Sequence, residues 1–217
     1  LKHYAGQIDQ AGHTVKFAVA RGPLNIACFL MNSTDFLMAI RTDPEPIHRL
    51  LTIVTDFLID WLKLQAETFS SIDGVLILDD IVGFLGEEDF KAMALPYIER
   101  IFQSLDVSVR FFHNDAGGLV CAPYLEQIGV NLFNFSFNHT LSEMKALTNN
   151  AVTLVGNIPT VEVLAAGTAE DVQRSVRDAL EGVEDKSRII LSCGGGVPGG
   201  VSSENIKAFV SAVGQVA

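Results

Sequence analysis

The sequence has few cysteines, and they are widely separated. There are three, Cys28, Cys121 and Cys193, and a number that is small and odd does not indicate the disulfide framework of a small secreted domain. A reducing compartment suits such free thiols, and we therefore expect a cytoplasmic protein. No signal peptide is visible, and the chain begins at Leu1 rather than at Met. We expect it to be a segment of a longer protein.

Basic residues and long apolar runs are also scarce. Asp and Glu number 26 against 15 Lys and Arg, which gives a net charge of −11, and no basic run exceeds two residues. Nucleic-acid binders need a concentrated positive surface, so a nucleic-acid partner is not expected. The apolar stretches are shorter than the roughly 20 residues that cross a bilayer, so we expect no membrane partner.

What the sequence does contain is a regular alternation of β-rich and helical segments. With 217 residues and 48% hydrophobic content, residues 1–217 can form a single domain with one large core, and no linker interrupts them. Such alternation is typical of parallel βαβ units. The six predicted strands are Val15–Ala20, Val75–Leu78, Val109–Phe112, Asn131–Asn134, Val152–Val155 and Arg188–Ser192.

The helices are predicted from apolar periodicity and capping residues. Helical spacing covers Pro46–Phe69, Glu87–Leu105 and Val172–Leu180, Thr168 is placed to cap a helix, and Ser202 to open the last one. The pattern predicts an α/β fold, a (β/α)8 TIM-type barrel that is incomplete here, with about six β/α units. An open Rossmann-like sheet is the alternative, but no G-x-G-x-x-G turn follows the first strand.

In parallel barrels the reactive groups follow the carboxyl ends of the strands. Polar residues are unusually frequent at these positions, and we expect them to converge on one mouth. They are Arg21, Asp79 and Asp80, His113 to Asp115, Asn134 and Ser136, Asn157, and Ser192 with Cys193.

Asp79 and Asp80 are candidates for acid–base catalysis. They follow an apolar strand, where burial and mutual repulsion raise the pKa of a carboxyl group. Alternatively, Asp79 caps the following segment and Asp80 forms a local ion pair. Arg21 could bind a substrate carboxylate in a bidentate manner or pair with one of these aspartates.

His113 and Asp115 are two positions apart in an extended segment, so their side chains should point the same way. They could be a base and its orienting partner, or two metal ligands, although a histidine bonded to its own loop is a common structural arrangement. With Cys193 they could complete a zinc site, since zinc accepts N, S and O ligands. Cys193 could equally be an inert buried thiol. His139, Cys28 and Cys121 are interpreted as structural.

Several ordered segments resemble the uroporphyrinogen decarboxylase family. They are Pro23–Met31, Ala94–Ile98, Gly156–Pro159, and Gly195–Pro198 followed by Ser203–Ile206. The resemblance implies roughly the C-terminal two-thirds of a (β/α)8 barrel, without the first two strands and the N-terminal helices. It would allow a homodimer.

The family contains tetrapyrrole decarboxylases that need no cofactor, and zinc-dependent methyltransferases that move a methyl group between a corrinoid protein and a thiol such as coenzyme M. This chain departs from both. Phe29 stands where decarboxylases have a tyrosine, and Asp80 stands where they have a serine. Their late histidine corresponds to a position near Gly194 in this chain. The methyltransferase motif His-x-Cys reads His113-x-Asp115, and Cys193 lies one position early.

The resemblance implies an enzyme with a tetrapyrrole-like small-molecule substrate or a corrinoid protein partner. We expect a decarboxylase-like carbon–carbon lyase that acts on a tetrapyrrole-related or similar carboxylated substrate. The alternatives are the zinc-dependent methyltransferase and a barrel that binds a corrinoid or tetrapyrrole without turnover. The expected catalytic residues are Asp79, Asp80, His113 and Asp115, and the expected substrate-binding residues are Arg21, Phe29, Asn134, Asn157, Gly194 and Gly195.

Overall fold

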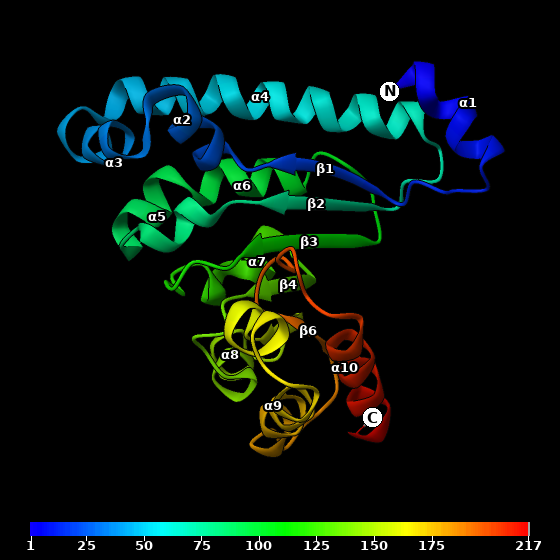
Figure 1. Ribbon diagram of the computed structural model, residues 1–217. Helices are drawn as coiled ribbons and strands as arrows, with labels where there is room; N and C mark the ends of the chain where they lie inside the picture. Colours follow the sequence, from blue (N-terminus) through cyan, green and yellow to red (C-terminus); the bar gives the residue numbers. More distant parts are fainter. Residues whose placement is uncertain (217) are drawn as a thin grey trace.

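A computed structural model describes residues 1–216, which form one six-stranded parallel sheet flanked by helices (Figure 1). Every predicted strand is present, with ends shifted by up to three residues. The strands are β1 Phe17–Arg21, β2 Gly74–Leu78, β3 Val109–Asn114, β4 Leu132–Phe135, β5 Thr153–Ile158 and β6 Ile189–Cys193.

Strand order distinguishes the two sheet architectures that the sequence allowed. The order β1-β2-β3-β4-β5-β6 pairs each strand with its neighbour in the chain, and all these pairs are parallel. In a Rossmann-like sheet the order of the strands reverses at a switch point, and the strand order of this sheet does not reverse. The fold is therefore an α/β partial TIM-type barrel, as predicted. Within residues 1–216, β1 and β6 form the two edges and do not pair with each other.

The helices agree with the predicted periodicity except at one position. The expected helix Glu87–Leu105 is broken at Ala94 into α5 and α6. Pro96 accounts for the break, because it lacks a backbone N–H and its ring clashes with the preceding turn. The helices are α1 Lys2–Gln10, α2 Pro23–Met31, α3 Ser33–Thr42, α4 Pro44–Thr68, η1 Asp80–Phe84, α5 Glu87–Met93, α6 Leu95–Phe102, η2 Ala122–Tyr124, α7 Leu125–Ile128, α8 Leu141–Leu147, the π-helix η3 Thr160–Ala165, α9 Ala169–Glu181 and α10 Ser203–Val216.

The predicted helix starts at Thr168 and Ser202 are confirmed. Thr168 and Asp171 form a reciprocal capping box at the start of α9. The Ser202 hydroxyl accepts a hydrogen bond from the backbone N–H of Asn205 at 3.0 Å. Each hydroxyl satisfies an N–H group that the helix leaves without a partner, which fixes where these helices begin.

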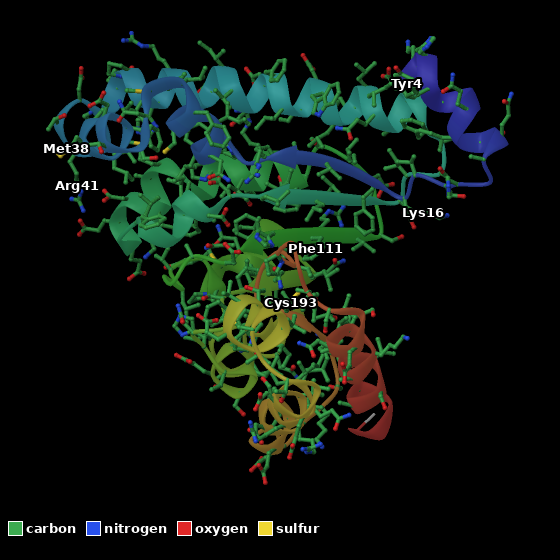
Figure 2. The ribbon with its side chains drawn as sticks, viewed as in Figure 1. Tyr4, Lys16, Met38, Arg41, Phe111 and Cys193 are labelled. Atoms are coloured by element: carbon green, nitrogen blue, oxygen red, sulfur yellow. The ribbon has the colours of Figure 1, made fainter. Side chains whose placement is uncertain are left out.

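The two faces of the sheet differ in burial. Residues that alternate along the strands on the outer face, such as Ala18, Ile77 and Phe112, are fully buried beneath the helices. On the inner face Val19 is 41% exposed and Ile190 is 50% exposed. Phe111 also lies on this face (Figure 2). The helix-covered side therefore forms the main core, and the inner side is an accessible surface.

The outer edge of β1 is occupied by a side chain from α4. The backbone N–H of Val19 donates to Oε1 of Gln65 at 3.0 Å, and the carbonyl oxygen of Val19 accepts from Nε2 at 3.1 Å. Gln65 is itself 8% exposed. A primary amide offers one acceptor and one donor side by side, so Gln65 satisfies both backbone groups that Val19 directs away from β2.

No single helix in residues 1–216 is long and apolar enough to cross a membrane. Helices α2 and α3 reach that length and composition only together, and they bend by 107° where they meet. Several of their apolar side chains, including Leu24 and Phe36, are fully buried in the core.

Candidate active site

A row of neighbouring residues crosses the inner face near the carboxyl ends of the strands. Arg21 is in register with Leu78, Leu78 with His113, and His113 with Asn134. Residues in register on adjacent strands share a face of the sheet. The sheet therefore places Arg21, His113 and Asn134 on one surface, as the strand-end argument predicts.

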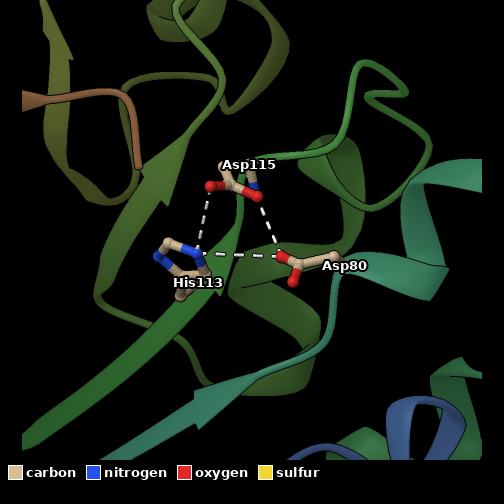
Figure 3. Close-up of side chains that lie close together, drawn as sticks. All are labelled: Asp80, His113 and Asp115. Atoms are coloured by element: carbon tan, nitrogen blue, oxygen red, sulfur yellow. Dashed lines mark hydrogen bonds and ion pairs between the residues drawn. The ribbon is translucent and has the colours of Figure 1, made fainter. Parts of the chain in front are cut away.

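Asp80, His113 and Asp115 form a compact cluster on this surface (Figure 3). Nε2 of His113 lies 3.7 Å from Oδ1 of Asp80 and 3.6 Å from Oδ2 of Asp115. The backbone N–H of Asp115 donates to Oδ1 of Asp80 at 3.3 Å. The prediction that His113 and Asp115 point the same way is confirmed, and Asp80 reaches them from the start of η1.

The two carboxylates of the cluster favour the binding of a proton or a cation. Burial is the largest cause that raises the pKa of Asp80, and the nearby negative charge of Asp115 raises it further, whereas His113 lowers it. Two carboxylates that share one small site repel each other, and a bound positive charge relieves that repulsion. The side chain of His113 is 15% exposed, and those of Asp80 and Asp115 are 31% and 36% exposed.

The ligand atoms of the cluster fit a metal ion. One imidazole nitrogen and two carboxylate oxygens lie within 4.8 Å of one another. Metal–ligand bonds of about 2.0–2.2 Å in a tetrahedron hold neighbouring ligand atoms roughly 3.4 Å apart, close to the 3.6 and 3.7 Å found here. These contacts are too long for good hydrogen bonds. Three protein ligands with partial exposure leave a fourth position for a substrate group, as in catalytic zinc sites.

Gly195 allows the loop after β6 to approach the cluster closely. Gly195 has a φ of 131°, and a Cβ there would lie 2.6 Å from Oδ2 of Asp115. The loop after β6 therefore packs directly against the Asp115 carboxylate because Gly195 has no side chain. The sequence predicted Gly195 as a substrate-binding residue, and its contact with Asp115 places it beside the cluster.

Asp79 points away from the cluster and into the protein. It is fully buried, and its carboxylate accepts from the backbone N–H groups of Leu24 at 2.8 Å and Asn25 at 3.1 Å. It thus caps the N-terminus of α2, a helix earlier in the chain, rather than the segment that follows it. Gly22 makes room for it, since a Cβ at Gly22 would lie 2.3 Å from Oδ2 of Asp79. Burial raises the pKa of Asp79 to about 8, against the opposing effect of these N–H groups.

The structure groups Asp80, rather than the predicted Cys193, with His113 and Asp115. Cys193 is 8% exposed and packs in an apolar cluster with Ile158 and Val176, between the sheet, α9 and α10. Side chains alternate between faces along a strand, so Ser192 rather than Cys193 shares the face of His113. Asp80 takes the third position instead.

Asn134 and Asn157, which were predicted to bind substrate, form hydrogen bonds to neighbouring strands and loops. Nδ2 of Asn134 donates to the carbonyl oxygens of Val155 at 2.6 Å and Cys193 at 3.1 Å, and Nδ2 of Asn157 donates to the carbonyl oxygen of His139. These donors are used within the protein, and substrate contact by either asparagine stays a prediction.

The remaining predicted substrate residues lie around the mouth. Arg21 is exposed at the end of β1, and Phe29 is 68% exposed on α2. In residues 1–216 no ion pair joins Arg21 to Asp79 or Asp80, so its guanidinium is available to a ligand. Gly194 packs against the backbone of Phe137, where a Cβ would lie 2.5 Å from the Phe137 nitrogen.

A cavity of about 560 Å³ lies beside the mouth, between α8 and α9. Its lining includes His139, Asn157 and Arg174, and it does not include the three members of the cluster. Titratable side chains such as Glu162 and Asp178 also line this cavity. The cluster, however, brings three ligand atoms within 4.8 Å of one another at the strand ends, so we place the chemistry there. Sequence reasoning missed that Gly22 makes room for the Asp79 carboxylate, because a single glycine carries no signal of what it contacts.

Comparisons with known proteins identify similar sequences and a similar fold. The family model described as Uroporphyrinogen decarboxylase (URO-D) matches residues 9–216. The chain is 27% identical over 177 residues to a uroporphyrinogen decarboxylase of Chloroherpeton thalassium, which covers 79% of this chain and 49% of the relative. It is 32% identical over 181 residues to the decarboxylase of Actinobacillus succinogenes, with coverage of 79% and 49%.

A methyltransferase is also among the similar proteins. The chain is 23% identical over 191 residues to a methylated-thiol–coenzyme M methyltransferase of Methanosarcina mazei, which covers 88% of this chain and 50% of the relative. A solved methyltransferase structure from Methanosarcina mazei has a TM-score of 0.83 at 19% identity, and covers 98% of this chain and 62% of that one. This structural likeness shows the shared fold. The chain spans about half the length of the curated relatives it matches.

Proposed function

Because the chain belongs to the uroporphyrinogen decarboxylase family, we propose that it carries the metal-binding part of a methyltransferase active site. In this proposal Asp80, His113 and Asp115 hold a divalent metal ion, zinc being the first candidate, and the reaction moves a methyl group between a methylcorrinoid protein and a thiol. The observation that carries the proposal is the convergence of three ligand atoms within 4.8 Å at the strand ends.

The choice of ligands supports this function over a purely structural role. Structural zinc sites are closed by four protein ligands, whereas this cluster offers three with partial exposure. A similar protein is described as a methylated-thiol–coenzyme M methyltransferase, and it aligns with 88% of this chain. Two carboxylates in place of cysteine thiolates give a harder ligand set, which transfers less charge to the metal.

A metal ion held here would lower the pKa of a thiol bound at its open position, which favours the nucleophilic thiolate. The protein's own residues then have separate roles. Asp80 and Asp115 offset the positive charge of the metal, and His113 fixes the third ligand direction from the end of β3. Arg21, on the same face of the sheet, binds an acidic group of the thiol substrate.

Metal content and affinity test this proposal. The full-length protein should purify with close to one zinc per chain, and removal of the metal by a chelator should abolish thiol methylation until zinc is restored. Substitutions His113→Ala and Asp115→Asn should remove the metal, whereas His48→Ala should retain it, because His48 bonds to Tyr97 on another part of the fold. A metal-free protein with full activity would contradict the proposal.

Decarboxylation is the second candidate, and the raised pKa of Asp80 favours it. A carboxyl group with a raised pKa is suited to deliver a proton to a substrate carbon, and Arg21 can bind a substrate carboxylate. Incubation of the metal-free full-length protein with uroporphyrinogen tests this. Products with fewer carboxyl groups, formed by the parent and lost in Asp80→Asn, would support decarboxylation. Unchanged substrate would count against decarboxylation of uroporphyrinogen.

A further inference from the structure

The turn that carries Asp115 is held from two sides by groups outside the cluster. On one side it touches η1, the segment that carries Asp80. A Cβ at Gly118 would lie 2.0 Å from the carbonyl oxygen of Gly83, and a Cβ at Gly83 would lie 2.5 Å from Cβ of Ala116. The backbones of the two segments are therefore in direct contact, and this contact sets how close Asp80 and Asp115 can be.

On the other side the turn is held by His139, which lies between β4 and α8. Nε2 of His139 lies 2.9 Å from the carbonyl oxygen of Gly117, and its Nδ1 lies 3.3 Å from Oε2 of Glu143. The carbonyl oxygen of His139 accepts from Nδ2 of Asn157. His139 is thus anchored to α8 through its imidazole and to β5 through its backbone carbonyl oxygen, and its Nε2 reaches the turn two residues after Asp115.

We propose that His139 is a positioning residue for the cluster, which restrains the 115–118 turn through its hydrogen bond to the Gly117 carbonyl oxygen so that Asp80 and Asp115 remain within reach of His113. The expected effect on metal binding rests on the proposed metal site. The hydrogen bond between His139 and the turn does not depend on it. The imidazole contacts no member of the cluster and acts only through the backbone of Gly117. Its hydrogen bond restrains the turn in the same way that outer hydrogen bonds orient metal ligands.

Two variants isolate the hydrogen bond from the bulk of the side chain. His139→Ala removes the donor, whereas His139→Gln keeps an N–H group that can reach the Gly117 carbonyl oxygen. His48→Ala serves as the matched control, because His48 is also partly buried and hydrogen-bonded, to the hydroxyl of Tyr97 at 2.7 Å. All variants are made in the full-length protein.

The first measurement is metal affinity, with Co²⁺ followed by its visible absorption and Zn²⁺ followed by competition with a chelating dye. His139→Ala should weaken binding about 10-fold or more, as loss of an outer hydrogen bond does at metal sites. His139→Gln should recover most of the affinity, and His48→Ala should match the parent. If the parent binds metal and His139→Ala binds it equally well, the positioning role is wrong.

The second measurement needs no metal, so it separates failure of this inference from failure of the proposed function. Backbone amide exchange of a peptide that spans residues 115–119 is followed by mass spectrometry in metal-free protein. We expect faster exchange in His139→Ala and parent-like exchange in His139→Gln and His48→Ala. A parent that binds no metal would end the metal proposal, and the exchange result would still decide whether His139 holds the turn.

Discussion

The buried carboxyl group of Asp79 should make the stability of the protein depend on pH in an unusual direction. Its pKa is raised to about 8 in the folded protein, from an ordinary value of 3.8 in the unfolded chain. Between these values the folded state holds a proton that the unfolded state has released. The free energy of unfolding therefore falls as pH rises, by roughly 1.4 kcal/mol per pH unit from this group alone.

The substitution Asp79→Asn isolates this contribution, because asparagine has the shape of the protonated carboxyl group and cannot ionise. From about pH 5 to about pH 7 the parent should lose roughly 3 kcal/mol of stability relative to the variant. Below about pH 4 the pKa no longer distinguishes folded from unfolded parent, and the difference between parent and variant should become constant.

Urea unfolding of the full-length parent and variant at several pH values, followed by circular dichroism, gives this difference directly. Only the difference between the two proteins is interpreted, so titrating groups that do not interact with Asp79 cancel. The opposite slope, with the parent gaining stability on the variant as pH rises, would refute the reasoning. It would mean that the N–H groups of Leu24 and Asn25 at the α2 terminus outweigh burial and keep Asp79 ionised.

Three further predictions concern the glycines and the cysteine. Gly22→Ala should lower the free energy of unfolding by about 1–3 kcal/mol, measured by urea unfolding, because the new Cβ would overlap Oδ2 of Asp79; an unchanged midpoint would contradict the contact. Gly118→Ala should weaken metal binding more than Gly6→Ala, whose Cβ would meet nothing within 4 Å; equal affinities in a cobalt titration would show that the contact with Gly83 does not set the site. Cys193→Ser should leave zinc content unchanged, since the thiol lies in the apolar cluster between α9, α10 and the sheet; loss of zinc on elemental analysis would restore Cys193 as a ligand.

The sheet was predictable from the sequence because each strand is a local pattern. Runs such as Val75 to Leu78 are apolar throughout, and the alternation with helices indicates parallel pairing. The break in the helix after Asp80 was missed because the apolar period continues through Pro96, and the period was given more weight than the proline.

The site was predictable only where it depends on a single strand end. His113 and Asp115 follow from the period of two along β3, and their shared direction is confirmed. Cys193 was grouped with His113 from its position at a strand end, but neighbouring residues on a strand face opposite sides, and Cys193 lies in an apolar cluster. The separation of Asp79 from Asp80 depends on where α2 packs, and no local pattern at these residues contains that information.

The amide of Gln65 also has a consequence for how the protein meets other chains. An exposed edge strand is a template on which a foreign strand can add, and such addition is a common start of aggregation. Because both backbone groups of Val19 are already bonded to Gln65, an incoming strand would find the middle of β1 closed. Any strand that pairs with this edge, whether it belongs to this protein or to another, must first displace the Gln65 side chain.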